Sequence, residues 1–109
     1  MLFYIYFMKE IRLAVHSTPD RLALMNALED VFLVNKTGTF VPSLLIVDED
    51  SPDARYCIDE AIKYNTPIIR LTALPESLRE QEPKIAHTFE KVYKVEDVVD
   101  KAKELVGDQ

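Results

Sequence analysis

Glycine and cysteine are scarce in this sequence, and each shortage excludes a class of site. Only two glycines occur in 109 residues, Gly38 and Gly107, so a glycine-rich loop that cradles phosphate cannot be built. The single cysteine, Cys57, has no partner for an internal disulfide or for a zinc site, and we expect it to pack in the core. A reducing, cytoplasmic compartment is the location that fits this cysteine usage.

Basic residues are also too few for a nucleic-acid surface. The chain has 13 Lys and Arg against 19 Asp and Glu, which gives a formal net charge of −6. Phosphate binding requires clustered Lys and Arg side chains, so nucleic acid is not an expected partner. A chain of this length forms one core, and we therefore treat residues 1–109 as a single domain.

No apolar run is long enough to span a bilayer, so no membrane partner is expected. The most apolar stretch is residues 1–7, MLFYIYF, which also lacks the charged start and the cleavage site of a secretory signal. Its aromatic and β-branched residues favour an extra N-terminal strand at the edge of a sheet. The other interpretation is that Met8 is the real start and that the preceding residues are an upstream artefact.

The stretch that organises the rest of the chain is residues 44–52, LLIVDEDSP. Four apolar residues are followed by three carboxylates, Asp48, Glu49 and Asp50, and then by Ser-Pro. A short apolar run of this kind is typical of a buried parallel strand. Because ligands collect at the carboxyl ends of such strands, the three carboxylates mark the candidate site.

Strand and helix patterns alternate along the chain. Four apolar segments are expected to form strands, namely residues 11–15, 44–48, 67–71 and 91–95. Each strand is followed by an expected helix. The first helix has Thr18 as N-cap and Pro19 at N1, and the second is capped by Asp50 or Ser51. The third and fourth helices are expected at residues 75–82 and 96–106. The alternation predicts a three-layer α/β/α fold with a mostly parallel sheet and right-handed crossovers.

The second strand-helix unit of this pattern is shortened. Residues 31–34, VFLV, fit either the last turn of a helix or a short strand, and residues 35–38 fit a turn. A complete strand-helix unit needs roughly 30 residues, more than this region offers. The sheet edge beside residues 11–15 is then expected to be open. We expect residues 1–7 to fill it, by a hairpin within the chain or by pairing across a homodimer.

Two segments together resemble the receiver domains of response regulators, the CheY-like superfamily with a flavodoxin-like fold. In LLIVDEDSP, Asp48 and Pro52 have the spacing of the family's phospho-accepting Asp and the Pro four positions later. In TPIIRLTA, Thr72 ends the next strand at the family's switch position, and Lys94 in KVYKV falls where receivers carry a Lys. The resemblance covers about residues 9–106. It implies two-component signal transduction, a phosphorelay, and protein partners in a signalling or regulatory pathway.

The sequence departs from the family where receivers hold Mg²⁺. The acidic pair that follows the first strand in the family is His16 and Ser17 here. Mg²⁺ prefers oxygen ligands and neutralises charge on a transferring phosphoryl group, so the loss of both acids leaves Asp48 as the matched carboxylate. Glu49 and Asp50 form a residual acidic site, and Asp48 and Asp50 remain as candidate metal ligands.

The expected function is therefore that of an atypical receiver, a pseudo-receiver, which acts by protein–protein interaction or dimerisation. In this state no cofactor is bound, Asp48 is not phosphorylated, and Lys94 forms a structural ion pair with Asp48. The alternative is a functional single-domain response regulator, in which a histidine kinase phosphorylates Asp48 with the help of Mg²⁺.

An enzyme is not expected, although two enzyme or cofactor classes share features of the pattern. The carboxylate cluster would suit a haloacid-dehalogenase type of phosphatase, but the chain lacks that family's D-x-D motif and cap. A flavodoxin-like cofactor binder would need a phosphate loop rich in Ser, Thr and Gly after the first strand, and HSTPD offers only Ser17 and Thr18. No Ser-His-Asp pattern, G-x-S-x-G motif or paired His is present.

Overall fold

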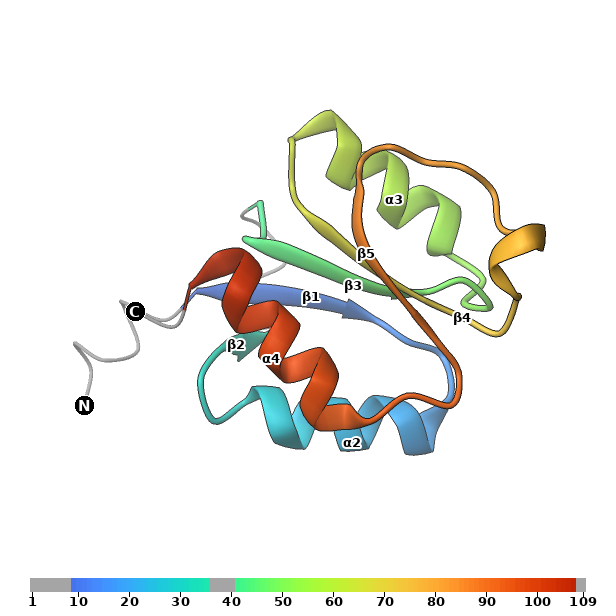
Figure 1. Cartoon of the computed structure of the whole chain (residues 1–109). Helices are drawn as coiled ribbons and strands as arrows, with labels where there is room; N and C mark the ends of the chain where they lie inside the picture. The colour runs from blue at the N-terminus through green and yellow to red at the C-terminus, as the bar shows by residue number, and fades with distance from the viewer. Residues whose placement is uncertain (1–8, 36–40, 108–109) are drawn as a thin grey trace.

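A five-stranded sheet forms the centre of the protein. The computed structural model describes residues 9–35 and 41–107. All strands run parallel, in the order β2-β1-β3-β4-β5 (Figure 1). The strands are β1 (Glu10–Ala14), β2 (Leu33–Val34), β3 (Leu44–Asp48), β4 (Ile68–Thr72) and β5 (Ile85–Glu90). The predicted three-layer α/β fold is confirmed, and within the described residues the sheet is entirely parallel.

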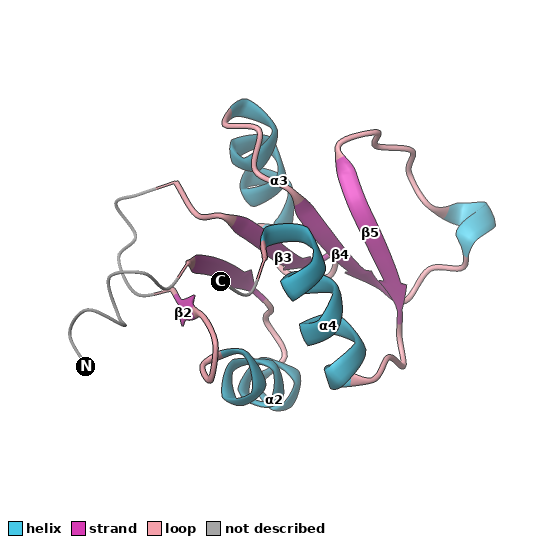
Figure 2. Cartoon of the chain, turned by 60° about the vertical axis from the view of Figure 1, so that its left-hand side comes forward, coloured by secondary structure: helices cyan, strands magenta, loops and turns pink. Residues whose placement is uncertain are grey.

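Helices lie on both faces of this sheet. The helices α2 (Thr18–Leu28) and α4 (Val95–Val106) pack on one face, and α3 (Ala54–Lys63) packs on the other (Figures 1 and 2). The short segment η1 (Glu76–Leu78) is a 3-10 helix of three residues. Within residues 9–35 and 41–107, no helix has the length and apolar character needed to cross a membrane.

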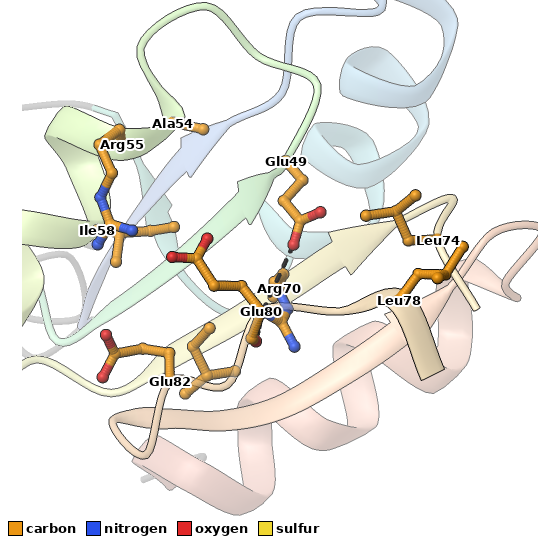
Figure 3. Close-up of a pocket in the computed structure, with 10 residues that line it drawn as sticks. Glu49, Ala54, Arg55, Ile58, Arg70, Leu74, Leu78, Glu80 and Glu82 are labelled. Atoms are coloured by element: carbon orange, nitrogen blue, oxygen red, sulfur yellow. Dashed lines mark hydrogen bonds and ion pairs between the residues drawn. The ribbon is translucent and has the colours of Figure 1, made fainter. Parts of the chain in front are cut away.

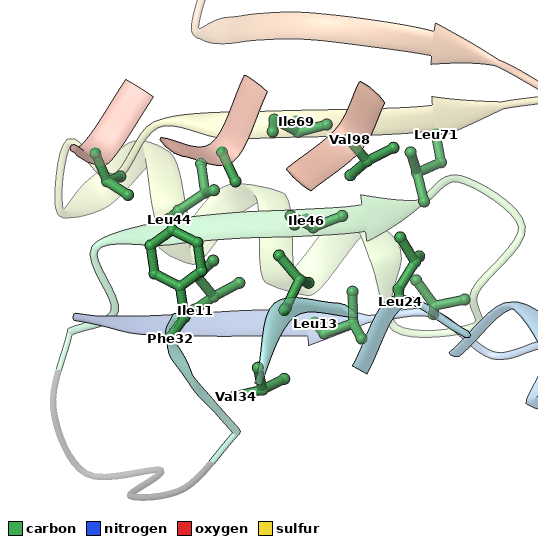
Figure 4. Close-up of a cluster of buried hydrophobic side chains, with 14 residues drawn as sticks. Ile11, Leu13, Leu24, Phe32, Val34, Leu44, Ile46, Ile69, Leu71 and Val98 are labelled. Carbon is green, nitrogen blue, oxygen red and sulfur yellow. The ribbon is translucent and has the colours of Figure 1, made fainter. Parts of the chain in front are cut away.

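Apolar side chains fill the space on both sides of β3. Every residue of β3 is buried, as the uninterrupted LLIVD run predicts. The larger cluster lies between the sheet and the pair α2 and α4, where Ile46 and Val98 are fully buried (Figure 4). The smaller cluster lies under α3 and includes Cys57, so the prediction that this thiol packs in the core is confirmed.

The helices begin within a few residues of the predicted positions. Helix α2 begins at Thr18, and the N-cap is Ser17, one residue earlier than predicted. Helix α3 begins at Ala54 with Asp53 as N-cap, so neither Asp50 nor Ser51 holds that position. The hydroxyl of Ser51 instead donates to Oδ1 of Asp53 at 2.7 Å, which fixes the N-cap carboxylate at a helix end where negative charge is favourable.

The last strand lies earlier in the chain than predicted. It is β5, Ile85–Glu90, and not residues 91–95. Within IAHTFE, Phe89 packs against the cluster under α4, whereas Thr88 contacts Arg70 on the opposite face. This alternation has the period of two residues that a strand requires. Residues 91–94 form the connection to α4.

The connection between β4 and β5 also differs from the prediction. Residues 75–82 were expected to form a helix, but this segment contains only η1. Four of its eight residues are charged, and its apolar residues are too few to give the stripe with which a helix packs on a sheet. Consequently α3 is the one full helix on its face of the sheet within the described ranges.

The edge of the sheet beside β1 is occupied by β2 and by the side chain of Asn35. The backbone N–H groups of Leu33 and Asn35 donate to the carbonyls of Lys9 and Ile11, both at 3.0 Å. The Asn35 amide then continues the pairing, because its Oδ1 accepts from Leu13 N–H at 2.9 Å and its Nδ2 donates to Leu13 C=O at 3.0 Å. Within the described residues this edge is therefore not open, contrary to the prediction.

The extra strand predicted for residues 1–7 lies outside the described residues. VFLV, for which a helical turn and a short strand were both considered, is divided between a turn and the two residues of β2. The second strand-helix unit is thus reduced to β2 and residues 35–43, of which 36–40 also lie outside the described residues.

Candidate functional site

The candidate site lies at the carboxyl ends of β3 and β4, where the sequence places its polar residues. Asp48 is the last residue of β3, and its neighbours along the strand are fully apolar. Only 2% of Asp48 is exposed, so its carboxylate must find partners inside the protein. One oxygen, Oδ1, accepts the backbone N–H of Asp50 at 2.9 Å.

The other oxygen of Asp48 pairs with Lys91 and not with Lys94. The distance from Lys91 Nζ to Asp48 Oδ2 is 2.7 Å, and Lys91 Nζ also lies 3.4 Å from Oδ2 of the exposed Asp50. The expected ion pair of Asp48 with Lys94 is wrong. Lys94 lies four residues beyond the end of β5 and is the N-cap residue of α4. Lys91 comes directly after β5, whose last residues pair with the end of β4, and this brings its amine to the end of β3.

The surroundings of Lys91 favour its charged form. Burial alone lowers the pKa of the Lys91 amine, but the hydrogen bond and the negative charge of Asp48, with a smaller contribution from Asp50, outweigh this effect. The net result is a raised pKa for Lys91. The Asp48–Lys91 pair is therefore an ionic, hydrogen-bonded contact that compensates a buried carboxylate.

Thr72 ends β4 beside this pair, but its hydroxyl is engaged by Glu49. Thr72 Oγ1 donates to Glu49 Oε1 at 3.0 Å and accepts the N–H of Leu74 at 3.0 Å. The other oxygen of Glu49, Oε2, lies 3.4 Å from Nη1 in the guanidinium group of Arg70, which is a residue of β4. Glu49 thus links the end of the sheet to the face under α3, a role that sequence reasoning did not assign to it.

His16 and Ser17 lie in the turn between β1 and α2, and both are exposed. Ser17 is the N-cap residue of α2, and its carbonyl accepts the N–H of Arg21 at 2.9 Å. The structure therefore gives Ser17 a helix-capping position. His16 and Ser17 contribute no carboxylate beside Asp48, as the sequence already requires.

The donor set around Asp48 does not fit a resident Mg²⁺ ion. Both oxygens of Asp48 are engaged, one by a lysine ammonium, which repels a cation. Mg²⁺ requires six oxygen ligands in near-octahedral geometry, which come from one or two carboxylates together with waters or phosphate oxygens. In the ranges that the structure describes, no group of three or more His, Cys, Asp or Glu side chains is arranged to hold a metal.

Two residues near the site were missed by sequence reasoning or left without a role. Lys91 could have been found from the alternation in IAHTFE, which places a strand end directly before it. Tyr93 lies between the two lysines, and its ring is 6.5 Å from that of Phe89. Its hydroxyl is buried without a hydrogen-bond partner among the described residues, and burial, with the charges of Asp20 and Asp48, raises the pKa of Tyr93.

Comparison with known proteins gives structural matches only. No protein-family model matches the sequence, and a search of curated proteins finds no match. Among solved structures, the BeF3-activated receiver domain of DrrB superposes with a TM-score of 0.77 at 16% identity, covering 91% of this chain and 97% of that one. A response regulator from Thermotoga maritima gives a TM-score of 0.71 at 17% identity, covering 92% of this chain and 98% of that one.

A third structure carries a metal at its site. The receiver domain of a sensor histidine kinase from Pseudomonas aeruginosa, with magnesium coordinated in its active-site cleft, gives a TM-score of 0.65 at 15% identity. The superposition covers 92% of this chain and 98% of that domain. Across nearly its whole length, this chain therefore has the CheY-like α/β fold of response-regulator receiver domains.

Proposed function

We propose that this chain is an atypical receiver-type signalling domain that acts through contacts with protein partners and without phosphorylation of Asp48. The observation that carries this proposal is the state of Asp48. Its carboxylate is buried, and each of its two oxygens already has a partner, Lys91 Nζ for one and the N–H of Asp50 for the other. This supports a structural role for Asp48, because loss of the Lys91 contact would leave a buried charge uncompensated.

The residues around Asp48 support the same conclusion. Phosphoryl transfer to a carboxylate depends on cations that neutralise the developing charge. Receivers supply this charge partly through a metal, and His16 and Ser17 stand here where the resemblance calls for the metal-binding acids. Thr72, at the switch position, donates its hydroxyl to Glu49. We expect no enzymatic turnover from this site.

A second candidate function is a phosphorylated response regulator. The placement of Asp48, Lys91 and Thr72 at neighbouring strand ends favours it, because these are the residue types that the resemblance implies for a working site. In that case a carboxylate oxygen of Asp48 attacks the phosphorus of a kinase phosphohistidine, forming an acyl phosphate and releasing the imidazole. Lys91 then pairs with a phosphoryl oxygen.

Amide NMR spectra of the full chain, titrated with Mg²⁺ and then with beryllofluoride, test the proposal. We expect no saturable shift around Asp48, Thr72 and Lys91 at millimolar Mg²⁺. The matched control is the double variant His16→Asp, Ser17→Asp, which returns both acids and is expected to respond saturably. A saturable response of the unmodified chain that is lost in Asp48→Asn would show that Asp48 accepts phosphate and would establish the second candidate.

A further inference from the structure

The connection between β4 and β5 leaves part of the sheet without a helix over it. Parallel neighbours need a crossover of a dozen or more residues, usually a helix. Here residues 73–84, all of which are described, contain only the three residues of η1. The face of β4 and β5 on the side of α3 is therefore bordered by α3 and by this irregular segment.

A groove of about 320 Å³ lies between these borders (Figure 3). Its apolar wall comes from three parts of the chain: Ile58 on α3, Leu74 and Leu78 around η1, and Ile85 at the start of β5. Leu74 is 41% exposed and Leu78 is 67% exposed, although burial of a leucine side chain stabilises a protein. Because both leucines line the same groove, they give it an apolar surface that a partner could cover.

The floor of the groove is charged but internally neutralised. The Arg70 side chain is only 9% exposed, and its Nη1 lies 3.4 Å from Glu49 Oε2. Arg70 also donates to the carbonyl of Glu80 at 3.0 Å and to the hydroxyl of Thr88 at 3.2 Å. These contacts fix Arg70 in place and hold residue 80 against the sheet, so that the groove is formed before any partner arrives.

The rim of the groove is acidic. Arg55, the other lining cation, makes an ion pair with Asp59 at 2.7 Å, so its charge is compensated outside the groove. Glu80 and Glu82 also line the groove. Among the described residues neither carboxylate takes part in an ion pair, and Oε1 of Glu82 accepts the backbone N–H of Lys84 at 3.2 Å. The uncompensated charge of this surface is therefore negative, in line with the net charge of −6 of the whole chain.

We infer that this groove binds a partner-protein segment in which apolar anchor residues are flanked by Lys or Arg. The anchor packs between Ile58, Leu74 and Leu78, and the basic side chains pair with Glu80 and Glu82. The volume lies at the low end of the range for small-molecule sites, which suits one or two anchor side chains better than a cofactor. A second copy of this chain would bring another acidic surface to an acidic rim, so charge favours a different, basic partner.

The inference deepens the proposed function, because it assigns a surface and a partner chemistry to a domain that acts through protein contacts. The probe is a synthetic ten-residue peptide with two leucines four positions apart, flanked by lysines. Its control is the same peptide with glutamates in place of the lysines. Amide and methyl NMR spectra of the full chain are recorded with each peptide, without Mg²⁺ or beryllofluoride.

The expected result is a saturable shift at Ile58, Leu74 and Leu78 with the basic peptide and no saturable shift with the acidic one. Leu78→Asp should weaken binding about tenfold, which corresponds to about 1.4 kcal/mol, and the double variant Glu80→Lys, Glu82→Lys should weaken it similarly. The matched control is Leu22→Asp, which changes a leucine on α2 that is 50% exposed and should leave binding unchanged.

Three results would overturn the inference. They are no saturable shift at millimolar basic peptide, equal binding of the acidic peptide, and concentration-dependent shifts in the groove without peptide, which would identify a second copy as the occupant. Failure here remains distinguishable from failure of the proposed function. The beryllofluoride titration reads the Asp48 site, whereas the peptide titration reads the groove, and either can fail alone.

Discussion

Lys91 and Lys94 lie three residues apart in KVYKV, yet they occupy different environments. Lys91 makes the contact that compensates a buried carboxylate, whereas Lys94 is an exposed N-cap residue. Replacing Lys91 by Met removes the charge but keeps most of the apolar stem, and it leaves Asp48 with only the N–H of Asp50. We expect Lys91→Met to lower the free energy of unfolding at pH 7 by about 2 kcal/mol.

The matched variant Lys94→Met should change stability by less than about 0.5 kcal/mol. Because the pKa of Lys91 is raised in the folded state, its contribution is complete below the unfolded pKa of about 10.4 and is lost as the pH rises through the folded pKa. The difference between the wild-type chain and Lys91→Met should therefore shrink at pH 11. Urea unfolding at pH 7 and pH 11 measures it, and equal effects of the two lysine variants would contradict the assignment.

Among the elements, the shortest strand, β2, relies on a side chain to extend its hydrogen bonding to β1. β2 has two residues, and the Asn35 amide supplies the two hydrogen bonds that a longer strand would make to Leu13. Asn35 has a positive φ of 53°, a conformation that Asn and Gly tolerate. In Asn35→Gly the backbone shape is retained while both hydrogen bonds are lost.

We expect Asn35→Gly to lower the free energy of unfolding by about 1–3 kcal/mol, since the backbone groups of the buried Leu13 lose their partners. The matched control is Asn65→Gly, after α3, where Asn65 has a φ of 58°. That change should be nearly neutral because Gly also suits this conformation. Chemical denaturation of both variants gives the comparison, and an Asn35→Gly variant as stable as the wild-type chain would show that water replaces the amide at this edge.

The elements that could be predicted are those with a strong local pattern. β3 follows from an uninterrupted apolar run and β4 from an apolar run interrupted by Arg70, whereas α3 and α4 follow from amphipathic stripes. β5 was not placed in the same way, because IAHTFE mixes apolar and polar residues and the valines of residues 91–95 gave a more apolar pattern. The error moved the strand end by five residues and therefore assigned the wrong lysine to Asp48.

The candidate site was also predictable only in part. Asp48 and Thr72 end strands that the sequence marks clearly, so their positions at the carboxyl ends were predictable. The contact of Thr72 with Glu49, and of Glu49 with Arg70, depends on how three side chains from two strand ends turn toward one another. No spacing in the sequence records this choice, which also involves contacts of Thr72 with Leu74 and of Arg70 with the carbonyl of Glu80.

At the scale of the whole molecule, Cys57 provides a single internal reporter of unfolding. It lies in the cluster between α3 and the sheet, and burial, with the nearby charge of Asp53, raises the pKa of its thiol above the ordinary value of 9.0. The thiolate, which is the reactive form, is thus disfavoured in the folded state. Stability should fall as the pH rises above the unfolded pKa, because the unfolded chain then loses its thiol proton more readily.

We expect Cys57 in the folded chain to react with a thiol reagent at pH 8 at least about a thousandfold more slowly than in urea, as a free energy of unfolding near 5 kcal/mol requires. The rate should rise with urea in step with global unfolding. Cys57→Ser serves as the blank. Rapid labelling that does not depend on urea would instead mean that α3 detaches while the rest of the sheet remains folded.

The Asn35 amide has one further consequence, which concerns the alignment of β2 on β1. A strand of two residues carries little information about its own register, and a slip by one residue would turn the buried Val34 out of the core. The amide binds both backbone groups of Leu13, so it meets matching partners in one alignment and is left unpaired after a slip. Asn35 thus fixes the register of β2, so that a very short strand pairs with β1 in one alignment.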